Sequence, residues 1–189
     1  MKSIIRFVKR NSRTISTCTS LVYSLLTVYI CLKYGWSSEI AHKLSAYILL
    51  GGYSLDLLIP GHKLETKSHH GLGLIIICFF IKMLGTAQYY EIKPIVKYFL
   101  YLEVTNIFNN YRSLSTKYKP KYKQMTQMMF ALTFLTIRPH CFYQAEKFFY
   151  KNPLPLQFKY FIRGILLLNV YWMVLISRIF YVKLRKKLK

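Results

Sequence analysis

Residues 69–90, HHGLGLIIICFFIKMLGTAQYY, decide the fold class of this 189-residue chain. After the two histidines the stretch is mostly apolar as far as Tyr90, and Lys82 is the charged residue within it. As an α-helix, residues 71–90 would be about 30 Å long, which matches the hydrocarbon thickness of a bilayer. The stretch therefore predicts a helix that spans a membrane.

Five other stretches resemble this one in length and composition, in a chain that is 53% hydrophobic and 17% aromatic. Two of the five give weaker signals, because one is short and another contains Glu103. The sequence predicts an all-α fold, in which about six transmembrane helices form the compact bundle of a polytopic membrane protein. The five stretches are residues 16–32, 44–59, 95–111, 125–145 and 158–182.

The basic residues that produce the net charge of +22 flank these stretches. They are enriched at both termini and between the fourth and fifth stretches, which predicts cytosolic termini by the positive-inside rule. Residues 1–15 would form a basic cytosolic start, residues 16–182 the membrane domain and residues 183–189 a basic cytosolic tail. A nucleic-acid partner is not expected, because the charges border apolar helices and do not line a soluble face.

The last residues are Lys186-Lys187-Leu188-Lys189. Lysines three and four residues from the end of a cytosolic tail resemble the dilysine retrieval signal of endoplasmic-reticulum membrane proteins. The sequence thus predicts an integral protein of that membrane, with a plain basic flank as the alternative.

Ionisable residues inside the apolar stretches are the candidates for a functional site, because each costs several kcal/mol at membrane depth. Asp56, the only aspartate, lies near the end of the second stretch, and His69-His70 precede the third. Glu103, Asn106 and Asn110 have the spacing of one helical face in the fourth stretch. In the predicted topology these residues converge on the cytosolic half of the bundle and form a polar pocket.

Two arginines and one lysine also bear on this pocket. Arg112 follows the fourth stretch, and Arg138 lies within the fifth. Arg138 and Lys82 are expected to face the pocket or a water-filled cavity, since buried cations need polar surroundings.

The pocket could support acyl chemistry. His69 or His70 could act as general base or nucleophile toward an acyl group, with Asp56 orienting the imidazole. Asn and Arg side chains could bind an acyl carbonyl or a phosphate headgroup. The alternative is that these residues satisfy one another between helices, which is favoured for Asn106 and for Arg112, whose side chain can reach the interface.

No cofactor or metal is expected. A mononuclear site formed by His62, His69 and His70 is left open, whereas a di-iron centre would need more than the five histidines of the chain. The four cysteines lie far apart without a CxxC pair and are interpreted as small apolar residues.

Several stretches together resemble the TLC domain, the module shared by translocation-associated membrane proteins, ceramide synthases and the neuronal ceroid lipofuscinosis protein 8 group. The sequence EVTNIFNNYR at 103–112 is similar to the E-x-[ST]-x-x-F-x-N-x-R pattern of TLC-domain proteins outside the ceramide synthases. The resemblance extends over about residues 16–182 and implies a helical membrane fold with a role in lipid handling. The other matching stretches are GYSLD at 52–56, HH at 69–70, FLTIR at 134–138 and LNVYW at 168–172.

One departure from the family affects the expected activity. Ceramide synthases have a D-x-x-D arrangement after the histidine pair, where this chain has Glu103-x-x-Asn106. The resemblance therefore implies the fold and a lipid-related role more strongly than it implies acylation of a sphingoid base.

Three functions compete at this point. The first is a protein that influences phospholipid or sphingolipid composition through an intramembrane pocket for a lipid or acyl chain. The second is an acyl-CoA-dependent acyltransferase, and the third is a non-catalytic chaperone or adaptor. The expected partner is a membrane lipid, with acyl-CoA and a second copy of the chain left open. Adjacent helical positions differ by about 100°, so the sequence leaves open which histidine faces the pocket.

Overall fold

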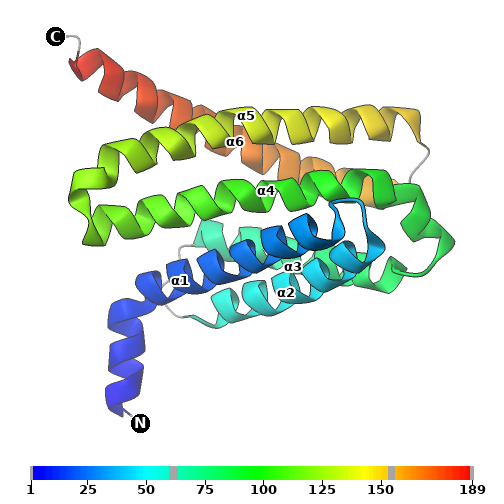
Figure 1. Cartoon of the computed structure of the whole chain (residues 1–189), viewed down its shortest axis with the longest axis horizontal. Coiled ribbons are helices and arrows are strands. Elements are labelled where there is room, and N and C mark those ends of the chain that lie inside the picture. The colour runs from blue at the N-terminus through cyan, green and yellow to red at the C-terminus, as the bar shows by residue number, and fades with distance from the viewer. Residues whose placement is uncertain (1, 60–63, 153–155, 188–189) are drawn as a thin grey trace.

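The computed structural model describes residues 2–59, 64–152 and 156–187, and within these residues it contains helices and no strands (Figure 1). The all-α part of the prediction is thus confirmed, with six α-helices and one short 3-10 helix. The elements are α1 (Lys2–Tyr34), α2 (Glu39–Leu58), α3 (Leu64–Met83), α4 (Ala87–Tyr118), η1 (Pro120–Tyr122), α5 (Lys123–Lys151) and α6 (Leu156–Lys187).

Two glycines with positive φ end helices where the chain turns. Gly35, with φ of 86°, directly follows α1, and Gly85, with φ of 79°, lies between α3 and α4. Glycine adopts this left-handed conformation without the steric cost that a Cβ atom imposes. The turn at Gly85 corrects one sequence prediction, because it divides the stretch 71–90 and places its last residues in α4.

Helix α4 lies between α1 and α5 and packs extensively against both (Figure 1). Helix α1 also packs against α2, and α2 packs against α3, so the first four helices form one group. Helix α6 makes far fewer contacts, mainly with α5 and α3. Helix α6 is therefore the helix that is least tightly packed in the bundle. The beginning of α1 projects away from the bundle in Figure 1.

Buried polar side chains accompany an apolar core, and many large apolar side chains are exposed. Asp56 and Glu103 are 0% and 3% exposed, whereas Leu32 and Phe79 are 69% and 58% exposed. The apolar core includes Tyr23, Ile95 and Phe149. The buried charged groups are therefore the unusual feature of the interior, because Asp and Glu are seldom fully buried unless they are paired.

One helical segment among the described residues, Asn11–Tyr34 of α1, is both long and apolar enough to cross a membrane. It gives modest support for association with a membrane, and the six-span arrangement remains a prediction. Helices α2, α3 and α4 carry histidines or carboxylates within the same length, including several residues of the candidate site.

Two glycines allow close packing between neighbouring helices. A Cβ atom on Gly52 would lie 2.2 Å from Cδ1 of Tyr23, and one on Gly73 would lie 2.4 Å from Cε2 of Tyr53. Gly51 and Gly71, by contrast, have open space around them. Close packing at glycines of α2 and α3 is thus found at Gly52 and Gly73 among these four positions.

Replacing Gly52 by Ala should destabilise the protein by about 1–3 kcal/mol, because the added methyl overlaps an aromatic ring in the packed interior. Gly51→Ala is the matched control, since its methyl meets no atom and Ala favours helix by up to about 1 kcal/mol. Thermal unfolding in detergent would compare the two variants. Equal melting temperatures for both would contradict the close contact between Gly52 and Tyr23.

Candidate functional site

Two adjoining cavities run through the bundle and differ in character. The apolar cavity, of about 140 Å³, is lined mainly by aliphatic and aromatic side chains of α2, α3 and α4. The polar cavity, of about 460 Å³, is lined by hydroxyl, amide and charged groups from six helices, together with apolar side chains of α5 and α6. Both cavities are lined by Tyr53, His69, Asn106, Arg138 and Asn169.

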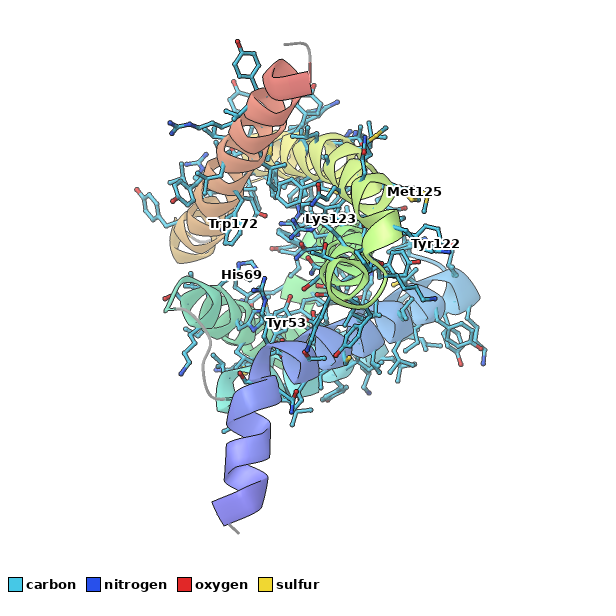
Figure 2. All side chains as sticks on the ribbon, turned by 90° about the vertical axis from the view of Figure 1, so that its left-hand side faces the viewer. Tyr53, His69, Tyr122, Lys123, Met125 and Trp172 are labelled. Atoms are coloured by element: carbon cyan, nitrogen blue, oxygen red, sulfur yellow. The ribbon has the colours of Figure 1, made fainter. Side chains whose placement is uncertain are left out.

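The polar cavity is lined by residues of all six α-helices, among them α3 and α6. Seen along the bundle in Figure 2, His69 and Tyr53 lie on one side of this region and Trp172 of α6 on the other. Because α6 packs loosely against the other helices, the cavity is bordered by the least constrained part of the fold.

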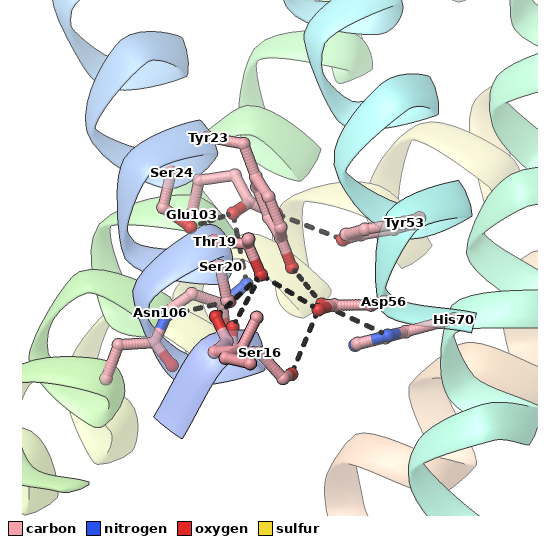
Figure 3. Close-up of polar contacts among 12 residues, drawn as sticks. Ser16, Thr19, Ser20, Tyr23, Ser24, Tyr53, Asp56, His70, Glu103 and Asn106 are labelled. Carbon is pink, nitrogen blue, oxygen red and sulfur yellow. Dashed lines mark hydrogen bonds and ion pairs between the residues drawn. The ribbon is translucent and has the colours of Figure 1, made fainter. Parts of the chain in front are cut away.

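The carboxylate of Asp56 is the centre of a first polar cluster (Figure 3). It accepts hydrogen bonds from three hydroxyl groups of α1, at 2.9 Å from Ser16, 3.2 Å from Thr19 and 3.1 Å from Tyr23. On its α3 side, Oδ2 lies 3.4 Å from Nδ1 of His70. A fully buried carboxylate is thus satisfied by donors from two other helices, as buried polar groups generally are.

The carboxylate of Glu103 is the centre of a second cluster. Its Oε2 accepts hydrogen bonds from Ser24 at 2.7 Å and from the Asn106 amide at 3.1 Å, and its Oε1 accepts one from the Tyr53 hydroxyl at 3.1 Å. The donors come from α1, α2 and α4. Glu103 therefore joins the three helices that surround it.

Arg138 connects this cluster to α5 and α6. Its Nε donates to the Thr105 hydroxyl at 2.9 Å, its Nη2 donates to Oδ1 of Asn106 at 2.9 Å, and its Nη1 donates to Oδ1 of Asn169. The guanidinium also lies 4.5 Å from the ring centroid of Phe134. Asn106 consequently bridges the negative Glu103 and the positive Arg138.

The two histidines have different environments. The His70 ring faces Asp56 and stacks on Tyr53, with centroids 5.0 Å apart and an angle of 6° between the planes. The His69 ring lines both cavities, and it has no hydrogen-bond partner among the residues that the structure describes. The structure thereby distinguishes the residues of the pair, with His70 in the Asp56 cluster and His69 at the junction of the cavities.

Asn110 and Arg112 lie further along α4. The Asn110 amide donates to the Ser20 hydroxyl at 2.8 Å, which joins α4 to α1. Arg112 donates from Nη2 to Oδ1 of Asn109 at 2.8 Å, and its guanidinium lies 4.6 Å from the ring centroid of Phe130.

The surroundings of Arg112 are strongly positive. Burial, followed by the positive charge of Arg13, lowers the pKa of the Arg112 guanidinium, which follows the apolar stretch 95–111. Arg112, which the sequence predicts at the membrane interface, therefore has a second cation, Arg13, near enough to repel it.

Other polar residues lie outside the two polar clusters. Lys82 is exposed and lines neither cavity, so the prediction that it faces a pocket is wrong. His42 lines the apolar cavity, and its ring is held between the Tyr89 hydroxyl at 3.0 Å and the Trp36 carbonyl at 2.8 Å. The four cysteines are free thiols.

The metal alternative cannot be completed from the described residues. His62, its third expected ligand, lies outside them, as do residues 188–189 of the dilysine sequence. Within the described part of the chain, no group of three or more His, Cys, Asp or Glu side chains is placed to hold a metal ion.

Some contributors to the site carried a sequence signal that went unrecognised. Ser16, Ser20 and Tyr23 lie at helical spacing within the apolar segment of α1, where they form a polar stripe. Tyr53 and Asn169 stand in stretches that resemble the TLC domain, but neither was selected as a site residue.

Comparison with known protein families, curated proteins and solved structures finds no match for this chain. The fold and the site define an all-helical protein with six helices, a helix suited to crossing a membrane, and a polar network in its interior.

Proposed function

We propose that the chain is a polytopic membrane protein whose interior cavity binds a membrane lipid. The distribution of side chains supports membrane insertion of more than α1. Large apolar side chains are exposed on several helices, whereas charged and amide groups are buried and paired between helices. Lipid tails can cover such an exterior, and the buried polar groups can satisfy one another in the absence of water.

The observation that carries lipid binding is the junction of an apolar cavity with a polar one. Phe80, Phe99 and Ile77 line the apolar side, whereas Arg13, Asn109 and Arg112 line the polar side. A lipid has the same division between an acyl chain and a polar headgroup. The residues shared by the two cavities would then lie beside the bonds that join chain and headgroup.

The volume of the apolar cavity limits what fits there. An apolar cavity of about 150 Å³ binds benzene in a well-studied engineered protein. The 140 Å³ cavity would therefore hold a short segment of an acyl chain. The remainder of the chain would extend into the polar cavity or between α3 and α6, where the helices pack loosely.

The Asp56–His70 pair favours a second candidate, acyl transfer. A carboxylate 3.4 Å from an imidazole can orient the ring and stabilise its protonated form while the ring acts as a base. Both side chains line the polar cavity, where an acyl carbonyl could lie. Lipid binding is the better supported of the two, because three hydroxyl groups already share the Asp56 carboxylate.

The resemblance to the TLC domain supports the same proposal. It implies a helical membrane fold and a lipid-related role for proteins that contain the Glu103–Arg112 pattern. We propose that the protein lies in the endoplasmic-reticulum membrane with residues 1–15 and 183–189 in the cytosol, on the basis of their basic composition.

Filling the apolar cavity should displace the lipid. Ile77 is 9% exposed and lines this cavity, and Trp at its position would occupy space that the acyl chain needs. We expect Ile77→Trp to reduce the lipid that copurifies with the detergent-solubilised protein by about tenfold, which corresponds to 1.4 kcal/mol. Extraction followed by quantitative mass spectrometry would measure the loss.

Ile75→Trp is the matched control, because Ile75 is two residues away on α3 and is 45% exposed. It should retain the wild-type amount of bound lipid and a similar melting temperature. Bound lipid that is equal in the two variants, with both folded, would argue against an acyl chain in the apolar cavity. A partner protein captured equally by all variants would then favour an adaptor.

A further inference from the structure

The polar cavity has an excess of positive charge. Arg13, Arg112 and Arg138 line it, whereas Asp56 is its carboxylate among the described lining residues. Asp56 is 0% exposed and is already surrounded by three hydroxyl donors and His70. The carboxylate of Asp56 is therefore already occupied by several donors, and among the described residues no ion pair is found for Arg13 or Arg112.

Arg112 has an unused donor inside the protein. Its Nε is buried and has no hydrogen-bond partner among the residues that the structure describes. Its recorded contacts, to the Asn109 amide oxygen and the Phe130 ring, are with neutral groups. A buried charged donor without an acceptor costs more free energy than a neutral one, so an incoming acceptor would be stabilising.

Arg13 makes an anionic acceptor beside Arg112 still more favourable. It precedes the polar stripe of α1, lines the same cavity, and lies near enough for its charge to repel that of Arg112. An anion between two guanidinium groups would replace this repulsion by two attractive interactions. Guanidinium groups bind phosphate in particular, because their paired N–H donors match its oxygen atoms.

The position of the two arginines at the ends of apolar stretches indicates which kind of anion would bind there. Arg13 precedes the apolar stretch 16–32 and Arg112 follows the stretch 95–111, while hydrogen bonds from Asn110 to Ser20 and from Lys117 to Thr14 hold α1 and α4 in this register. In a membrane both side chains would lie near the interface, where lipid phosphates are found.

We infer that Arg13 and Arg112 bind the phosphate group of an anionic ligand in the polar cavity. The inference rests on the proposed lipid binding and specifies its headgroup, and it disfavours a cationic lipid base as the ligand. The phosphate could belong to a phospholipid or to a water-soluble phosphate ester, and the experiment below separates these sources.

The test compares two lipids that differ only in the phosphate, dioleoyl phosphatidic acid and dioleoylglycerol. The full chain is purified, incubated with an equimolar mixture, and analysed by native mass spectrometry. We expect the wild-type protein to retain at least about ten times more phosphatidic acid, and the Arg13→Gln/Arg112→Gln variant to lose about tenfold of that preference. Equal retention of both lipids by the wild type would overturn the inference.

Arg178→Gln is the matched control, because this exposed arginine of α6 lies two residues beyond Ile176 of the cavity lining. It removes one positive charge outside the cavity, as each single arginine substitution does inside it, and should keep the wild-type preference. A loss of preference equal to that of the double variant would overturn the site in favour of general surface charge. Arg13→Gln alone, at an exposed position, keeps the test informative if Arg112→Gln fails to fold.

Two further arms distinguish the possible failures. Ile77→Trp should lower the retention of both lipids. If it does so while the arginine variants keep the preference for phosphatidic acid, lipid binding stands and the phosphate site is overturned. If Ile77→Trp retains both lipids like the wild type, the proposed lipid binding fails instead. Displacement of phosphatidic acid by stoichiometric glycerol 3-phosphate would support a soluble ester in this site, whereas resistance to it supports a phospholipid.

Discussion

Replacing Arg138 by Leu should destabilise the protein by about 3–5 kcal/mol, the range found when one partner of a buried charged network is removed. Arg138 is 7% exposed and its guanidinium donates to side chains of α4 and α6. Leu would leave three acceptors without their donor and would leave Glu103 without its nearest compensating charge. Thermal or denaturant unfolding of the purified protein in detergent would measure the change.

Arg138→Lys separates charge from geometry. Lysine keeps the positive charge but has a single nitrogen, whereas each of the three guanidinium nitrogens has a different acceptor. We expect a loss of stability between those of the wild type and Arg138→Leu. Arg163→Leu, which removes an exposed arginine paired with Glu146, should cause little measurable change. Equal effects of Arg138→Leu and Arg163→Leu would contradict the central role of the network.

The helical fold could be predicted because apolar stretches of bilayer length are a strong and local signal. The ends of the helices were harder to predict from the sequence. Helix α1 begins at Lys2 and not near residue 16, since basic and hydroxyl residues that lack the apolar pattern still continue the helix. Conversely, the apolar stretch 71–90 does not show the break at Gly85, where conformation and not hydropathy ends the helix.

The candidate site was predictable in its charged members and not in their pairing. Asp56, Glu103 and Arg138 attract attention because charge is costly in an apolar segment. The hydroxyl groups that satisfy Asp56 were missed, because Ser, Thr and Tyr are common in helices and become informative only when the neighbouring helix is known. The different environments of His69 and His70 depend likewise on how α3 is rotated against α2.

The same polar residues explain why hydropathy identifies one candidate span. His69 and His70 lower the apolar character of α3, and Glu103, Asn106 and Asn110 lower that of α4. Helix α1 carries hydroxyl groups in place of charges in the corresponding region, so its segment Asn11–Tyr34 stays apolar enough to span a membrane. The proposed membrane topology and the proposed site are thus linked, because the site reduces the signal of the helices that form it.

The same substitution at two adjacent histidines should produce different losses. We expect His70→Phe to destabilise the protein by about 1–3 kcal/mol, since the buried Asp56 carboxylate loses the partner on its α3 side while the stacking on Tyr53 can persist. His69→Phe should leave stability nearly unchanged, because the described structure contains no hydrogen-bond partner for that ring. Unfolding of both purified variants would test this difference.

The lipid readout of these variants then distinguishes the candidate functions. Because the His69 ring lies where the apolar and polar cavities meet, His69→Phe should change the lipids of cells that express it at wild-type abundance. Quantitative lipidomics with the wild type and His69→Phe as a pair would detect the change. A lipid effect confined to His70→Phe, at normal abundance, would instead favour acyl transfer through the Asp56–His70 pair. Identical lipid profiles for all three would remove both lipid functions, and would leave the buried polar network as the means by which six helices are held in one arrangement for an adaptor.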